Sequence, residues 1–248
     1  MDSSSIQWQI GCSGFHYKEW KKTFYPEDLP QRKWFEYYAD QFNCLELNVT
    51  FYRFPQLSFL QNWYTKSPPG FQFAAKVPRL ITHYKKFTDT KQQLDDFYLT
   101  INDGLQEKLG AVLFQLPPDL VFSEQALEKI VTQLNPSFKN VVEFRHASWW
   151  NDMVYTTLAK NNICFCSHSY PKLPDTVIQT TDTIYYRFHG IPKLYYSSYS
   201  REFLQKVAVD IKKLTAVRQA WLFFNNTAEL AAIRNARFLQ KQLAAVNS

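Results

Sequence analysis

The sequence predicts a (β/α)₈ TIM barrel that forms a single domain over residues 1–248. Short apolar, β-rich runs recur every 20 to 35 residues, and helical patterns separate most of them, which is typical of repeated βα units in a parallel sheet. Eight strands in serial order, joined by right-handed crossovers, close most naturally into a barrel, and an open doubly wound sheet is the alternative. The eight expected strands are residues 7–14, 44–50, 72–77, 111–116, 141–146, 163–169, 184–189 and 220–225.

Side chains that can cap a helix precede several of the intervening segments. Thr90 followed by Gln93 resembles a capping box and predicts a helix that extends to about Leu109. Ser123 is expected to cap a helix over 124–134, and Ser200 a helix over 201–214. Apolar residues at helical spacing predict a last helix over 227–243.

One crossover departs from this pattern. Residues 170–182, between the sixth and seventh strands, contain Pro171 and Pro174 and no apolar period. Proline removes a backbone donor and interrupts a helix. We therefore expect the helix between these strands to be short or missing.

Composition favours a globular protein with an anionic partner. Hydrophobic residues make up 46% of the chain and charged residues 20%, which excludes the disordered class. The 28 Lys and Arg residues exceed the 22 Asp and Glu residues, for a net charge of +6. This positive net charge suits an anionic small molecule or a nucleic acid as partner, but a cytoplasmic enzyme with surplus lysine has the same net charge without such a partner.

Several observations favour a cytoplasmic location without membrane contact. Residues 1–5 lack the basic and apolar regions of a secretory signal, and no window approaches the ~18 apolar residues of a membrane helix. The four cysteines, Cys12, Cys44, Cys164 and Cys166, fall inside expected strands and show no zinc-site spacing. We expect buried free thiols, as in a reducing compartment.

Polar residues near the ends of the expected strands predict the working face. Inward-pointing residues alternate along a barrel strand, and those near its C-terminal end face the active-site side. The polar residues in the second halves of the strands are Glu46, Asn48, Lys76, Gln115, Glu143, Arg145, Arg187, His189 and the closing pair Asn225-Asn226. We expect them to converge on one barrel mouth.

The charge of this set predicts the ligand. Lys76, Arg145 and Arg187 outnumber Glu46 and Glu143, so the mouth is expected to capture a phosphate or carboxylate, mainly through Arg187 and Arg145. The alternative is internal ion pairing that supports the barrel, such as Glu143 with Arg187. Charges are costly to bury unless they are paired.

Histidines and aromatic residues are expected around the same mouth. All five histidines lie at a strand end or in the loop after it: His16, His83, His146, His168 and His189. The loops after the first and seventh strands carry aromatic residues, which could stack on bases or sugars or simply pack. These are Phe15, Tyr17, Trp20, Phe24, Tyr25, Tyr195, Tyr196 and Tyr199.

Motifs spread over nearly the whole chain resemble the YecE-like family, a domain of unknown function. They include Gly11-Cys12-Ser13-Gly14, Glu46-Leu47-Asn48-Val49-Thr50-Phe51-Tyr52, Lys76 with Thr82-His83, Phe114-Gln115-Leu116-Pro117-Pro118, Glu143-Phe144-Arg145-His146, Tyr186-Arg187-Phe188-His189-Gly190 and Phe224-Asn225-Asn226-Thr227. The resemblance implies a TIM barrel and no assigned reaction. Ser167-His168 ends the sixth strand where the family commonly has an acidic residue.

The leading functional hypothesis is an enzyme, a hydrolase or isomerase, that acts on a phosphorylated or nucleic-acid-derived substrate. Its expected acid and base groups are Glu46, Glu143 and His189. Its expected substrate-binding residues are Asn48, Tyr52, Lys76, His83, Gln115, Arg145, Arg187 and Asn226.

Four alternatives remain open. A glycosidase could use Glu46 and Glu143, although a neighbouring arginine lowers a carboxyl pKa where a general acid needs it raised. A non-catalytic nucleic-acid-binding protein would account for the basic charge and the aromatics. Lys76 could form a Schiff base. A divalent metal could draw on Glu46, Glu143, His83, His168 and His189, although no metal-binding motif is present, and the sequence leaves the cofactor unassigned.

Overall fold

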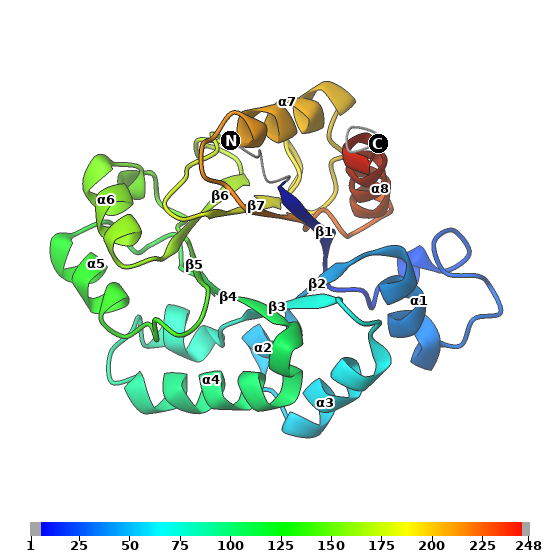
Figure 1. Ribbon diagram of the computed structural model, residues 1–248, viewed down its shortest axis with the longest axis horizontal. Coiled ribbons are helices and arrows are strands. Elements are labelled where there is room, and N and C mark those ends of the chain that lie inside the picture. Colours follow the sequence, from blue (N-terminus) through cyan, green and yellow to red (C-terminus); the bar gives the residue numbers. More distant parts are fainter. Residues whose placement is uncertain (1–5, 245–248) are drawn as a thin grey trace.

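Eight parallel strands form a closed barrel with helices on its outside, as the sequence predicts (Figure 1). The computed structural model describes residues 6–244; the segment 1–5, on which the expectation of no secretory signal rests, lies outside them. The strands, in both sequence and barrel order, are β1 (Gln7–Ser13), β2 (Cys44–Leu47), β3 (Gln72–Lys76), β4 (Leu109–Gln115), β5 (Asn140–Glu143), β6 (Cys164–Ser169), β7 (Thr183–Phe188) and β8 (Gln219–Phe224).

Helices follow most strands and cover the outer surface of the barrel (Figure 1). They are α1 (Trp34–Gln41), α2 (Val49–Tyr52), α3 (Leu57–Lys66), α4 (Lys91–Leu105), α5 (Glu124–Val131), α6 (Asp152–Lys160), α7 (Arg201–Lys212) and α8 (Ala231–Ala244). None of the helices described, within residues 6–244, is long and apolar enough to cross a membrane.

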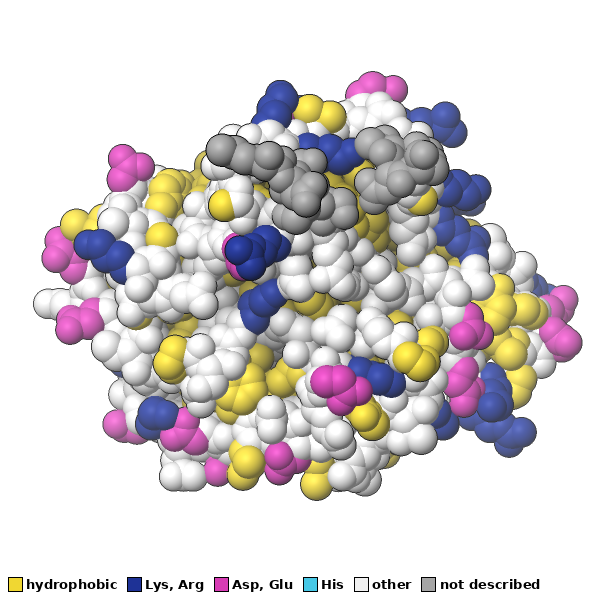
Figure 2. Space-filling model, in the orientation of Figure 1, with side chains coloured by type: hydrophobic (Ala, Val, Ile, Leu, Met, Phe, Trp, Pro, Cys, Tyr) yellow, Lys and Arg dark blue, Asp and Glu magenta, His cyan; other side chains and the backbone are white. Residues whose placement is uncertain are grey.

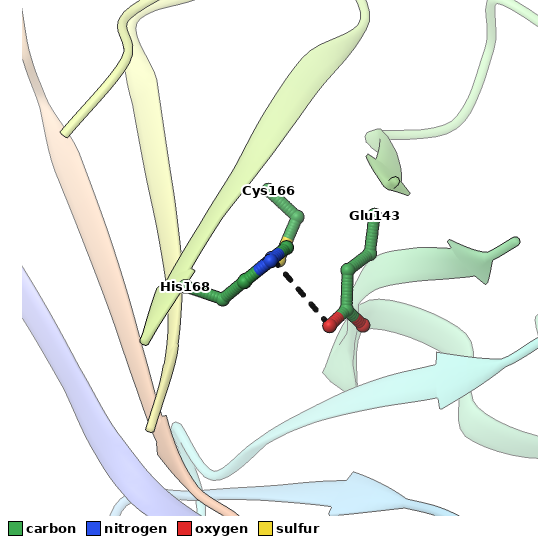
Figure 3. A group of neighbouring side chains, drawn as sticks. All are labelled: Glu143, Cys166 and His168. Atoms are coloured by element: carbon green, nitrogen blue, oxygen red, sulfur yellow. Dashed lines mark ion pairs between the residues drawn. The ribbon is translucent and has the colours of Figure 1, made fainter. Parts of the chain in front are cut away.

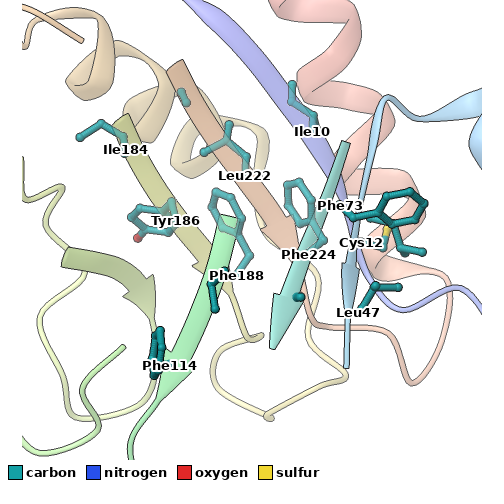
Figure 4. Close-up of a cluster of buried hydrophobic side chains, with 14 of the residues drawn as sticks. Ile10, Cys12, Leu47, Phe73, Phe114, Ile184, Tyr186, Phe188, Leu222 and Phe224 are labelled. Carbon is teal, nitrogen blue, oxygen red and sulfur yellow. The ribbon is translucent and has the colours of Figure 1, made fainter. Parts of the chain in front are cut away.

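Both faces of the strands are buried, in two separate cores, which is the usual state of a parallel sheet. Outward-facing side chains such as Phe73, Phe188 and Leu222 pack between the strands and the helices (Figure 4). Inward-facing side chains of the other parity, such as Leu113, Tyr185 and Trp221, fill the barrel interior. This strict alternation determines which polar residues reach the mouth.

Two of the three predicted side-chain caps are confirmed. The Ser123 hydroxyl accepts a hydrogen bond from the Ala126 backbone N–H, and Ser200 accepts one from Phe203. The predicted capping box at Thr90 is wrong, because the Thr90 hydroxyl donates to the Gln133 side-chain oxygen at 2.7 Å and makes no cap. The Thr90 hydroxyl thus bonds a residue distant in sequence and not the backbone of its own helix.

The missing helix between β6 and β7 is confirmed: residues 170–182, all of which the structure describes, form no helix. Hydrogen bonds from the outer side of β6 secure this segment instead. Thr180 Oγ1 accepts from the Phe165 N–H and donates to the Ile163 carbonyl, and Ser167 Oγ accepts from the Ile178 N–H. These bonds attach the proline-containing segment along β6 without a helix.

The second strand is shorter than predicted. Residues 44–50 were expected to be one strand, but β2 ends at Leu47 and α2 begins at Val49. The Thr50 hydroxyl donates to the carbonyls of Leu47 and Lys76, so it ties the turn to the ends of both β2 and β3. This turn carries the chain around the barrel mouth.

All four cysteines are buried free thiols, as predicted. Burial raises the pKa of the Cys164 thiol to about 12 and that of Cys166 well above its ordinary value. A thiol reagent should therefore react slowly with the native protein and titrate four thiols after denaturation without reductant. A count of two in the denatured, unreduced protein would contradict the buried-thiol assignment.

Candidate functional site

A buried arginine links three strands inside the C-terminal half of the barrel. Arg187 on β7 has no exposed side-chain surface, and its Nη1 lies 2.5 Å from Glu143 Oε2 on β5. Its Nη2 lies 2.6 Å from Glu46 Oε1 on β2, and the Tyr185 hydroxyl donates to the second Glu46 oxygen at 2.7 Å. This is the internal ion pairing that stood as the alternative to anion capture.

Glu143 has further partners on its other oxygen. Arg145 Nη2 and His189 Nε2 approach Glu143 Oε1 at 2.7 and 2.8 Å. Burial by itself would raise the pKa of the Glu143 carboxyl, but Arg145, Arg187 and His189 together hold it well below its usual range. Glu143 is therefore a permanent carboxylate and unsuited to donate a proton as a general acid.

The neighbours of His189 define its protonation state. Burial, and then the charge of Arg145, keep the pKa of His189 well below its ordinary value, so the ring is neutral. Asn225 Nδ2 lies 2.9 Å from His189 Nδ1, and since an amide N–H can only donate, Nδ1 accepts and Nε2 carries the proton toward Glu143. His189 thus joins Asn225 to the buried carboxylate. We call Glu46, Glu143, Arg145, Arg187 and His189 the buried ionic network.

A cavity of about 430 Å³ lies above this network, at the C-terminal mouth. Its lining includes five residues predicted for substrate binding: Asn48, Tyr52, Lys76, His83 and Gln115. The remaining lining residues are Tyr17, Phe51, Arg79, Tyr84, Tyr195 and Asn225. Within residues 6–244, no carboxylate contributes to this lining.

Lys76 is the buried cation of the cavity. Its Nζ donates to Gln115 Oε1 at 2.7 Å and lies 3.9 Å from the centre of the Phe51 ring. Burial, followed by the charge of Arg187, lowers the pKa of Lys76 to about 7. Near neutral pH the side chain therefore exists as both ammonium and amine.

Arg79 is the exposed cation of the cavity, and the strand pattern does not predict it because it lies beyond the strand, after Pro78. Its guanidinium lies 5.5 Å from the centre of the Tyr52 ring and 5.3 Å from that of Tyr84. In the part of the chain that the structure describes, no carboxylate comes within ion-pairing distance of it. Arg79 is free to meet a ligand.

The turn η3 (Leu80–Tyr84), one turn of π-helix directly after Arg79, carries two more lining residues. His83 Nδ1 bonds the Thr82 hydroxyl at 2.9 Å, and burial, reinforced by the charge of Lys76, lowers the pKa of His83 to about 4. His83 is therefore neutral at pH 7. Thr82-His83, one of the motifs that resemble the YecE-like family, lies in this turn.

Asn226, predicted to bind substrate, lies away from the cavity. Its Nδ2 donates to the Ser197 carbonyl at 2.9 Å and to Asn235 Oδ1 on α8 at 3.1 Å, so it anchors the loop after β7. Its neighbour Asn225 has the inward parity and lines the cavity. Arg145, Arg187, Glu46, Glu143 and His189 likewise contact one another and are not in the lining.

The rim aromatics divide between packing and lining. Trp20, Phe24 and Tyr25 are buried core residues, whereas Tyr17 and Tyr195 line the cavity. The histidines divide in the same way: His83 lines the cavity, His168 and His189 are buried, and His146 accepts a bond from the Ser148 N–H.

Glu143, Cys166 and His168 are the one group of possible metal ligands found within residues 6–244 (Figure 3). Their ligand atoms lie within 4.8 Å of one another, and neither ring nitrogen of buried His168 has a hydrogen-bond partner among the described residues. However, two guanidinium groups already contact Glu143, and their positive charge opposes a divalent cation there. The other expected ligands, Glu46 and His83, are not part of this group. We propose no metal at this position.

The fold and this mouth define a TIM-barrel protein with a polar cavity above a buried ionic network. Among known proteins, the family described as "Protein of unknown function DUF72" matches residues 9–248. The chain belongs to this family.

Relatives and solved structures agree with this membership. The chain is 26% identical to UPF0759 protein YunF of Bacillus subtilis over 68% of its length, and 30% identical to UPF0759 protein YecE of Escherichia coli K12 over 46%. The matches span 66% and 42% of those relatives. A DUF72 family crystal structure from Thermotoga maritima superposes with a TM-score of 0.85 at 31% identity, covering 95% of this chain and 99% of that one. One from Enterococcus faecalis, at 17% identity and TM-score 0.82 over 96% of each chain, shares the fold.

The buried ionic network generates a stability prediction. Replacing Arg187 by Met should lower the free energy of unfolding by about 3–5 kcal/mol, because two buried carboxylates lose their shared partner. Adding Glu46→Gln to Arg187→Met should recover part of this loss, since Glu143 still has Arg145. Urea unfolding of the two variants and the parent measures both effects. A loss below about 1 kcal/mol for Arg187→Met would contradict the assignment.

Proposed function

We propose that this protein is an enzyme that binds a small phosphorylated or nucleic-acid-derived substrate in the cavity at the C-terminal mouth. The observation that carries the proposal is the cavity's charge: Lys76 and Arg79 line it, and within residues 6–244 no carboxylate does. Active sites of TIM-barrel enzymes lie at this end of the strands. The cations that meet the substrate are therefore different from the pair expected from the sequence.

The buried ionic network explains this change. Arg187 is fully buried with a carboxylate at each end of its guanidinium. Arg145 pairs with Glu143, and its guanidinium carbon lies 4.1 Å from the centre of the Tyr170 ring. Capture of a phosphate by Arg187 would require breaking two buried ion pairs. Among the described residues, neither Lys76 nor Arg79 has a carboxylate partner, so both remain available.

The other lining groups suit a small substrate with a planar portion. The side-chain amides of Asn48, Gln115 and Asn225 can both donate and accept hydrogen bonds. Tyr52, Tyr84 and Tyr195, whose side chains are exposed, form an aromatic rim. Aromatic faces stack on nucleobases and sugar rings alike.

Both alternatives with a polymeric or sugar substrate are less well supported. Glu46 and Glu143 share one guanidinium and have no exposed surface, so neither reaches a glycosidic bond in the cavity. A cavity of about 430 Å³ is in the range of small-molecule sites. On the face seen in Figure 2, basic and acidic side chains are interspersed.

Inorganic phosphate provides the test. If it binds with a dissociation constant on the order of 1 mM, 50 mM phosphate adds about 2 kcal/mol of stability, or about 5 °C in Tm, beyond chloride at equal ionic strength. Arg79→Gln should remove most of this difference. The matched control is Lys193→Gln, because Lys193 lies over Tyr196 outside the cavity. Equal phosphate stabilisation of the parent and Arg79→Gln would contradict the anion site.

A further inference from the structure

We propose that Lys76 is a nucleophile that forms an imine with a carbonyl group of the substrate, which makes the substrate class anionic aldehydes or ketones. The inference rests on the proposed function, because it places the reaction in the same cavity. It goes further by assigning the reacting atom, Lys76 Nζ, and the group that it attacks.

The position of the side chain supports this role. Lys76 is the last residue of β3, its parity directs it inward, and it lines the cavity. Its one hydrogen bond within the described residues is to Gln115 Oε1, and the Phe51 ring lies against its Nζ. The amide and the ring hold the nitrogen, and two of its three ammonium protons have no acceptor within the described residues.

A second buried lysine shows what a structural role looks like in this chain. Lys108 is 7% exposed, as Lys76 is. Its Nζ donates three hydrogen bonds of 2.8 Å, to the Tyr64 carbonyl, the Ser67 carbonyl and the Ser67 hydroxyl. All three ammonium protons of Lys108 are thus satisfied by protein, whereas Lys76 has a single acceptor.

The electrostatic surroundings of Lys76 favour the neutral amine that an attack on a carbonyl requires. Burial lowers its pKa to about 7, and Arg187 and then Arg145 contribute in the same direction. The charged and titratable groups that face it from the neighbouring elements are Glu46, Glu143, Arg145, Arg187 and His83. The two glutamates oppose the shift but are themselves paired with arginines. A large fraction of unprotonated lysine at pH 7 is the condition for nucleophilic catalysis.

The chemical step is balanced without a further reactant. The Nζ lone pair forms a bond to the carbonyl carbon, the C=O π electrons move to oxygen, and a proton passes from nitrogen to that oxygen to give a carbinolamine. Loss of the second N–H proton with the hydroxyl as water then leaves a neutral C=N bond. Arg79, on the same cavity wall, would hold the substrate's anionic group during both steps.

Reductive trapping on the intact protein tests the inference. Pyridoxal 5′-phosphate, an aromatic aldehyde with a phosphate group, is added at pH 7 with sodium cyanoborohydride, and peptide mass mapping locates the reduced adducts. We expect Lys76 to be labelled at least tenfold faster than Lys193, which is exposed, and Lys108 to stay unlabelled. The labelling rate of Lys76 should reach half its maximum near pH 7, whereas an ordinary lysine requires a pH near 10. Lys76→Arg should abolish this adduct, and the matched variant Lys193→Arg should leave it unchanged.

A second probe separates this inference from the proposed anion site. Propionaldehyde carries no charge, so Arg79→Gln should slow labelling of Lys76 by pyridoxal 5′-phosphate but leave propionaldehyde labelling unchanged. Fast labelling of Lys76 by both probes, with no effect of Arg79→Gln, would support the nucleophile and overturn the anion site. Labelling of Lys76 no faster than that of Lys193 at pH 7 with either probe would overturn the nucleophile, while phosphate stabilisation would still test the anion site independently.

Discussion

The ion pairs of Arg187 with Glu46 and Glu143 are the constraint on which the rest of the mouth depends. Each of these three residues comes from a different strand, so the guanidinium ties β2, β5 and β7 together across the barrel interior. Two carboxylates without a shared cation would be costly to bury. Because both ends of its guanidinium are paired, we do not expect Arg187 to capture a ligand, and the cations that line the cavity are Lys76 and Arg79.

The mouth is therefore organised in two levels. The lower level is the buried ionic network, in which every carboxylate has a cationic or donor partner. The upper level is the cavity, in which Lys76 and Arg79 lie among amides and aromatic rings. Asn225 connects the two, because it lines the cavity and bonds His189, which in turn bonds Glu143. Charge below the cavity is balanced, and charge within it is positive.

The charges of the lower level also affect the pKa of Lys76 in the upper level. Lys76 lies close enough to Arg187 and Arg145 for their charges to disfavour its ammonium form, in addition to the effect of burial. A lysine near a carboxylate of its own would remain protonated. The pairing of both glutamates with arginines thus helps to explain why the Lys76 amine titrates near neutral pH.

Alternation along strands made much of the site predictable from sequence. Period-two parity correctly directed Glu46, Lys76, Gln115, Glu143 and Arg187 inward, because packing on both faces leaves a parallel strand no freedom to slip by one residue. The strand count and the missing helix followed from the apolar periodicity and the prolines.

Side-chain partners could not be predicted in this way. The alternation along the strands predicts that Arg187 and Glu143 both point into the barrel. Only the structure shows that both are fully buried and pair with each other. Arg79 lies past the end of its strand, where the alternation of side chains no longer applies. Asn225 and Asn226 are adjacent, so their side chains point to opposite faces, and only Asn225 lines the cavity. Thr90 has a local capping pattern, but a distant glutamine binds its hydroxyl.

In this barrel mouth the lower level is closed by its own ion pairs, and we propose that the upper level receives the ligand. The most direct measurement is side-chain nitrogen NMR of the intact protein during a phosphate titration, with resonances assigned by the Arg79→Gln, Lys76→Arg and Arg187→Met variants. We expect the Arg79 Nε and Lys76 Nζ resonances to shift with phosphate and the Arg187 Nε resonance to stay unchanged. A phosphate-dependent shift at Arg187 larger than that at Arg79 would contradict it.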